Sequence, residues 1–153
     1  MEVTRSSFPA RRYLAISHHG PYPEIGNSFE KLFGLIGPLG IEMAGPPAGF
    51  WYDDPESTPV DELRSDAAVP VGLDFELDHP DLHLIDVPEG EFLVSIYSGP
   101  YSGLPAAWSE FSHALEAAGG TDWDWCFEEY LNDHTEVPEA DLQTRLVASA
   151  KKS

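Results

Sequence analysis

Two stretches decide the fold of this chain: RYLAISHHGPY at residues 12–22 and EFLVSIYSGPY at residues 91–101. Both are rich in β-branched and aromatic residues, and both end in Gly-Pro-Tyr, where glycine and proline interrupt a strand. The second stretch begins at residue 91, which is 79 residues after the first begins at residue 12. We therefore predict strands at residues 13–18 and 92–97 and an internal repeat with that offset.

The same offset aligns the apolar residues that follow each Gly-Pro-Tyr. They recur at steps of three and four, which is the period of a helix that buries one stripe. The stripes are Ile25, Phe29, Leu32, Phe33 and Ile36 in the first copy and Leu104, Trp108, Phe111, Leu115 and Ala118 in the second. Gly119 and Gly120 suit the end of the second helix.

Each copy then continues with two strand-like segments. The first is aromatic, at residues 50–53 and 126–131, and runs into a polar connection, DDPESTP or NDHTEVP. The second alternates between apolar and polar residues, which is typical of a strand with one buried face. Its inward residues are Leu63, Ala67, Val69 and Val71 in the first copy and Leu142, Leu146, Ala148 and Ala150 in the second.

The pattern predicts an α+β fold made of two tandem β-α-β-β repeats, with antiparallel sheets and one main helix per repeat. Residues 10–72 form the first repeat, an acidic connector at about 73–90 has room for an extra edge segment, and residues 91–151 form the second. We expect all of residues 1–153 to form a single domain. By analogy with isologous dimers, we expect a pseudo-two-fold axis and a ligand cleft between the repeats.

Composition narrows the class of protein. The formal charge is −19, from 27 acidic and 8 basic residues, so a basic face that could neutralise nucleic-acid phosphates is not expected. No stretch approaches the roughly 20 apolar residues that cross a bilayer, and the N-terminus lacks the apolar segment of a secretory signal. A single cysteine excludes an internal disulfide. We expect a cytoplasmic protein that binds neither nucleic acid directly nor a membrane.

The run GFWYDDPESTPVDELRSD at residues 49–66, together with CFEEYLND at residues 126–133, resembles the GyrI-like small-molecule-binding family. That family includes SbmC-type gyrase inhibitors and the effector domains of AraC-type and BmrR-type regulators. The resemblance covers about residues 13–150. It implies a tandem strand-helix-strand-strand fold whose central cleft accepts bulky, often aromatic and cationic molecules above a deep glutamate.

That glutamate corresponds to Glu128. Its aromatic surroundings are unusual for a carboxylate that only solvates a surface, and the repeat places Gly49 at the equivalent position. The alternative is an exposed strand carboxylate. Its neighbour Glu129 should point to the opposite face and be solvated. Because only one copy carries the glutamate, we expect an asymmetric site, with its carboxylate from the second repeat alone, on a nearly symmetric scaffold.

Aromatic residues near the predicted axis are candidates to contact a ligand, although aromatic side chains more often belong to the core. They could stack on flat molecules and attract cations through their rings. With Glu128, the candidate ligand-binding residues are Tyr130, Trp51, Trp108, Phe29, Tyr97 and Tyr101. If the protein is a hydrolase, Glu128 and Tyr130 are the candidate catalytic residues.

No cofactor and no metal site are expected. His79 and His83 have a spacing of four, but Pro80 lies between them and the flanking sequence is not helical. Cys126 is better explained as a small strand residue than as a nucleophile, because no histidine can be assigned as its base.

Three hypotheses for function stay open. The first is a stand-alone binding protein that captures bulky hydrophobic molecules, cationic ones included, in an aromatic cleft with a buried glutamate. The second is a hydrolase of cyclopropane-containing or related reactive compounds, since some stand-alone relatives of the family have that activity. The third is a partner of DNA gyrase that inhibits or protects it, with the acidic surface docking on a basic face.

Overall fold

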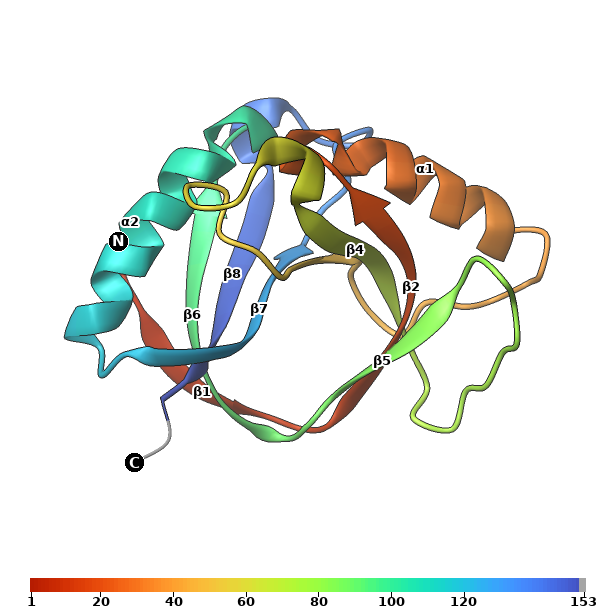
Figure 1. Ribbon diagram of the computed structural model, residues 1–153, viewed down its shortest axis with the longest axis horizontal. Coiled ribbons are helices and arrows are strands. Elements are labelled where there is room, and N and C mark those ends of the chain that lie inside the picture. Colours follow the sequence, from red (N-terminus) through yellow and green to blue (C-terminus); the bar gives the residue numbers. More distant parts are fainter. Residues whose placement is uncertain (152–153) are drawn as a thin grey trace. The chain divides into compact units, whose positions relative to one another are not determined.

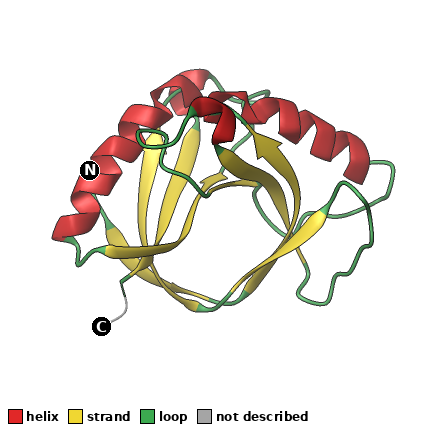
Figure 2. Cartoon of the chain, in the orientation of Figure 1, coloured by secondary structure: helices red, strands yellow, loops and turns green. Residues whose placement is uncertain are grey.

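The computed structural model describes residues 1–151 and divides into two compact units. The α1 unit comprises Ala10–Val87, and the α2 unit comprises Met1–Pro9 together with the chain from Pro88 onward. Each unit contains one α-helix and an antiparallel sheet of four strands (Figures 1 and 2). The predicted α+β class, with antiparallel strands and two main helices, is confirmed. None of the described helices is long and apolar enough to cross a membrane.

In the α1 unit the strand order is β3-β4-β2-β5. The bounds of its elements are β2 Arg11–His19, a 3-10 turn η1 Tyr22–Glu24, α1 Ile25–Ile36, β3 Ala48–Trp51, η2 Val60–Glu62, β4 Arg64–Val71 and β5 His83–Val87. The helix contacts β2 and β4 (Figure 1). Strand β5 lies in the stretch that the sequence suggested as a connector, and it pairs with β2 from Arg11↔Val87 to Ala15↔His83.

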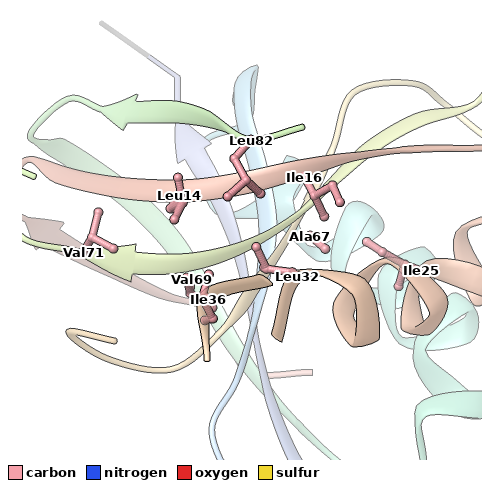
Figure 3. Packing of buried hydrophobic residues seen from close by; sticks show 9 residues of the cluster. All are labelled: Leu14, Ile16, Ile25, Leu32, Ile36, Ala67, Val69, Val71 and Leu82. Carbon is pink, nitrogen blue, oxygen red and sulfur yellow. The ribbon is translucent and has the colours of Figure 1, made fainter. Parts of the chain in front are cut away.

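The core of the α1 unit lies between α1 and one face of its sheet (Figure 3). It contains Leu14, Ile16, Ile25, Leu32, Ile36, Ala67, Val69, Val71 and Leu82. Ala67, Val69 and Val71 of β4 share the face that packs on the helix, as predicted. The other face of β4, with Ala68 and Pro70, is also buried, so the expectation of a single buried face was wrong. One member of the predicted helical stripe was wrong: Phe33 is 40% exposed, because the buried side of α1 is the narrower stripe of Ile25, Leu32 and Ile36. Phe33 instead stacks on Phe29.

In the α2 unit the strand order is β7-β8-β6-β1. The bounds are β1 Thr4–Phe8, β6 Gly90–Ser98, η3 Tyr101–Gly103, α2 Leu104–Ala117, β7 Thr121–Tyr130, η4 Glu139–Asp141 and β8 Gln143–Ala150. Its core combines Leu93, Leu104, Ala107, Phe111, Leu115, Leu146, Ala148 and Ala150. As expected, α2 ends just before two glycines with positive φ, Gly119 and Gly120.

Most elements of the two units begin at matching positions, although β3 and β7 do not. Strands β1 and β5 start at Thr4 and His83, and helices α1 and α2 start at Ile25 and Leu104. In each pair the separation is 79 residues. The N-terminal strand β1, which the sequence did not predict, pairs with β6 of the α2 unit.

Candidate functional site

Strand β7 positions the candidate glutamate of the α2 unit. Side chains two residues apart on a strand point to the same face, so Cys126, Glu128 and Tyr130 share a face. Glu128 pairs with Leu146 of β8, which belongs to the core under α2. Glu128 therefore faces the helix side of the sheet.

The Glu128 carboxylate is buried, since the residue is only 2% exposed. The indole N–H of Trp108, on α2, donates a hydrogen bond to Glu128 Oε1 at 3.2 Å. The phenol of Tyr130 lies on the same face of β7, close enough to Glu128 for the carboxylate to act on its pKa. Burial raises the pKa of Tyr130 well above 10, and the negative charge of Glu128 adds to the increase. The buried carboxylate thus has the indole N–H of Trp108 as a donor and the Tyr130 phenol close by.

A chain of aromatic rings connects this carboxylate to the surface of the α2 unit. The ring of Tyr101 lies 5.6 Å from that of Tyr130 and 6.1 Å from that of His134, both edge to face. Burial raises the pKa of Tyr101, with smaller contributions from Asp133 and Glu128. On the helix, the Trp108 ring lies 5.4 Å from Phe111. The environment of Glu128 is therefore aromatic and poor in water.

Cys126 shares this environment. Burial, together with the nearby charge of Glu128, raises the pKa of its thiol to about 12. A thiol with such a pKa holds almost no thiolate at neutral pH, so the structure gives Cys126 no nucleophilic character.

Tyr97 occupies a different place in the same unit. It lies on β6 and pairs with Thr144 of β8, which in turn pairs with Tyr130, so Tyr97 and Tyr130 are two strands apart. The Tyr97 hydroxyl donates to the Pro100 carbonyl at 2.8 Å. Its ring also lines a groove of about 600 Å³ beside α2, together with Gly103, Ala106, Ala107, Ser109, Glu110 and His113.

Two sequence-predicted residues belong to the α1 unit. Trp51, on β3, lies 4.6 Å from the ring of Tyr22, and Phe29 stacks on Phe33 at 6.0 Å. Gly49, at the position equivalent to Glu128, pairs with Ala67 of the core. Glu128, Tyr130, Trp108 and Tyr101 thus form one group in the α2 unit. Trp51 and Phe29 belong to the α1 unit.

The expectation for Glu129 was wrong. This residue is 4% exposed, and its Oε1 accepts a hydrogen bond from Arg145 Nη1 at 3.1 Å. Glu129 does point away from Glu128, but the opposite face of the sheet is also buried there. Arg145, directly across on β8, supplies the countercharge. Arg145, a basic residue within the alternating sequence of β8, was the feature of the sequence that could have indicated this ion pair.

A second polar cluster, in the α1 unit, escaped the sequence reasoning. Asp66 on β4 is 5% exposed, and its Oδ2 accepts hydrogen bonds from the Tyr52 hydroxyl at 2.5 Å and from His83 Nε2 at 3.0 Å. The hydrogen bond to Asp66 raises the pKa of His83. Burial and the same carboxylate raise the pKa of Tyr52 well above 10. His83 therefore has a carboxylate partner instead of a role beside His79. Among residues 1–151 no group of three or more His, Cys, Asp or Glu side chains could hold a metal ion.

The structure is that of an α+β chain that buries a carboxylate among aromatic rings under a helix. The chain belongs to the family of GyrI-like small molecule binding domains, whose model matches residues 1–149.

Relatives and solved structures agree with this membership. A curated protein named DNA gyrase inhibitor from Enterobacter lignolyticus is 26% identical over 143 residues, covering 86% of this chain and 87% of that protein. The EcmrR C-terminal domain superimposes with a TM-score of 0.80 at 16% identity, covering 99% of this chain and 98% of the domain. A structure bound to tetraphenylphosphonium superimposes with a TM-score of 0.72 at 15% identity, covering 99% and 94%. At these identities the two structures show the fold alone.

Proposed function

We propose that this protein binds bulky hydrophobic molecules, cationic ones included, with Glu128 as the anchoring carboxylate. The burial of Glu128 among Trp108, Tyr130 and Tyr101 carries the proposal. A group with this environment offers a negative charge that water does not screen and ring faces that attract cations. Membership of a small-molecule-binding family supports the assignment.

The preference for a cation follows from the cost of burying charge. A carboxylate in a low-dielectric site gains most from a ligand that carries the opposite charge into the same site. The formal charge of −19 adds a long-range attraction for cations. The ligand of the tetraphenylphosphonium-bound structure, a bulky aromatic cation, is therefore a suitable first probe.

The internal duplication would explain the matching positions of the elements in the two units. The duplication, the pseudo-two-fold axis and the ligand cleft between repeats stay predictions from the sequence. The candidate residues Trp51, Phe29 and Tyr97 are likewise proposed ligand contacts that rest on those predictions.

Quenching of tryptophan fluorescence by tetraphenylphosphonium tests the proposal. We expect saturable quenching in the micromolar range and a loss of affinity of at least about tenfold in Glu128→Gln, because truncating one partner of a buried charge pair costs several kcal/mol. Glu136→Gln is the matched control, since it removes the same charge from an exposed loop of the same unit. Equal affinities for the two variants, or no saturable quenching in the wild-type protein, would refute the proposal.

A second candidate function is hydrolysis of small reactive molecules, which the proximity of the Tyr130 phenol to the Glu128 carboxylate favours. In this scheme Glu128 accepts a proton from water as the water attacks a strained carbon, and the Tyr130 phenol donates to the departing group. Incubation with a cyclopropane-bearing alkylator would then give a ring-opened product carrying the oxygen of water. If Glu128→Gln forms product at the wild-type rate, this mechanism is wrong.

A third candidate is interaction with DNA gyrase, which the name of the curated relative and the acidic composition favour. Docking through opposite charges weakens as salt screens them. We expect inhibition or protection of gyrase supercoiling that decreases between low and physiological ionic strength. A supercoiling assay that stays unchanged with excess protein at low salt would remove this candidate.

A further inference from the structure

The start of β7 contains an unusual bulge that neither the Glu128 group nor the α2 core requires. Thr121 pairs with Ala150, but the next residue in register, Cys126, pairs with Ala148, so the chain inserts extra residues between them. The inserted stretch includes Trp123, whose φ is +59°. Within residues 1–151, Trp123 is the one non-glycine residue with a positive φ. This conformation is unfavourable for a bulky side chain.

Side chains fasten the bulge in place. The backbone N–H of Trp123 donates to Thr121 Oγ1 and that of Asp124 donates to Asp122 Oδ1, each at 3.0 Å. Ser149, buried on β8, donates its hydroxyl to Asp122 and accepts the backbone N–H of Trp125. These side-chain hydrogen bonds stabilise the unfavourable backbone conformation of Trp123, so the bulge is a specific feature of the fold. Bulges of this kind redirect side chains, and strained residues gather at functional positions.

The bulge presents the Trp123 indole to solvent beside a pocket. The side chain is 51% exposed, although tryptophan is among the most strongly buried residues on average. The pocket has a volume of about 490 Å³ and lies between the end of α2 and the start of β7, where Leu115, Glu116, Gly120, Trp123 and Lys151 line it. An indole, an aliphatic side chain and a carboxylate thus border one pocket.

Glu116 is the carboxylate that lines this pocket, and Lys151 lines it as well. A second basic group is near: Arg5 Nη1 lies 4.0 Å from the position of a Cβ at the lining residue Gly119, but Arg5 is paired with Glu91. Asp124 follows Trp123 in the chain and is exposed. The pocket also lies at the C-terminal end of α2, where the helix dipole is negative and the last turn carries no basic residue. The flat face of an indole attracts a positive charge held close to it.

We propose that this pocket is a second ligand site, for a small flat organic cation that stacks on Trp123 and pairs with Glu116. It is built from the end of α2 and the bulge of β7, and it does not depend on Glu128 or on the proposed function. The α1 unit has no equivalent, because β3 covers only Ala48–Trp51, where β7 extends over Thr121–Tyr130.

The probe for the test is N-methylquinolinium, followed by the amide resonance of Gly120 in ¹⁵N-labelled protein. We expect a saturable shift of this resonance that persists in Glu128→Gln. Glu116→Gln should weaken binding about threefold to fivefold, which corresponds to the loss of one exposed charge contact. Glu110→Gln, on the same helix but beside the other groove, should leave the affinity unchanged.

Replacement of Trp123 separates a ligand site from a merely structural bulge. Asparagine tolerates a positive φ, so Trp123→Asn should raise the melting temperature while weakening binding of N-methylquinolinium about fivefold. A higher melting temperature with unchanged affinity would overturn the proposal. So would the absence of a saturable shift at Gly120, or its disappearance in Glu128→Gln, which would assign the signal to the Glu128 group instead.

Discussion

Replacing Trp108 by phenylalanine should destabilise the protein by about 1.5–3 kcal/mol. The substitution keeps an aromatic ring against Phe111 but removes the indole N–H that donates to the buried Glu128 carboxylate at 3.2 Å. Hydrogen bonds to charged groups contribute about 1.5–3 kcal/mol, and a buried acceptor that loses its donor retains its desolvation cost. For a chain of this size, 1 kcal/mol changes the melting temperature by about 2–4 °C. The expected decrease is therefore about 3–12 °C.

Urea denaturation followed by circular dichroism measures this effect. The matched control is Trp123→Phe, which makes the same change at an exposed indole. Its free energy of unfolding should stay within about 0.5 kcal/mol of the wild-type value. A double-mutant cycle with Glu128→Gln assigns the loss to the contact itself, and we expect a coupling free energy of about 1 kcal/mol or more. If Trp108→Phe costs no more than the control, or if the cycle shows no coupling, the buried contact does not stabilise the protein as argued.

Three further predictions concern other contacts. Gly103→Ala should destabilise the protein by about 1–3 kcal/mol in thermal melts, because a Cβ at Gly103 would overlap the Tyr97 hydroxyl. The hydrogen bond to Asp66 raises the pKa of His83 in the folded protein, so its contribution to stability is complete below the unfolded pKa of about 6.5 and is lost as pH rises through the folded value. His83→Asn should therefore cost more at pH 5.5 than at pH 8.5 by up to about 1 kcal/mol, since the side chain is partly exposed. Cys126, with a thiol pKa of about 12, should react with a thiol reagent at pH 8 far more slowly in the folded than in the unfolded protein.

Controls accompany these measurements. Gly26→Ala, at a helical position where a Cβ meets no atom within 4 Å, should be neutral or stabilising. If Gly103→Ala behaves in the same way, Tyr97 does not require that glycine. A His83→Asn variant whose cost is the same at both pH values would show that the pair with Asp66 does not depend on protonation. Rapid labelling of Cys126 in the folded protein would contradict the raised pKa of its thiol.

The pattern of local residues was enough to predict most of the fold. The periodic apolar positions of each helix and the alternation of residues 63–71 and 142–150 identify elements whose core faces the structure confirms. Phe33 was assigned to the core wrongly, because periodicity does not reveal how wide a stripe the sheet can cover. Strand β1 was missed because its pairing with β6 joins residues 82 or more positions apart, and no local pattern reports such a partner.

The residues of the candidate site, like the elements of the fold, could be predicted from the sequence only in part. The aromatic setting of Glu128 was visible in the sequence, and so were Tyr130, its neighbour two residues along the strand, and Trp108 on the predicted helix. The pairing of Glu129 with Arg145 could not be predicted, because the burial of the second sheet face depends on the rest of the fold. The cluster of Tyr52, Asp66 and His83 was missed for a related reason, since it joins the residue after β3 to residues of β4 and β5 that are distant in the chain.

Whether Glu128 anchors a cation is tested most directly by comparing a charged ligand with a neutral one of similar shape. The affinities of tetraphenylphosphonium and triphenylphosphine oxide are measured for the wild-type protein and for Glu128→Gln. We expect the wild-type protein to prefer the cation and this preference to fall by at least about tenfold in the variant, while the neutral ligand binds both alike. An undiminished preference for the cation in Glu128→Gln would show that Glu128 does not anchor it.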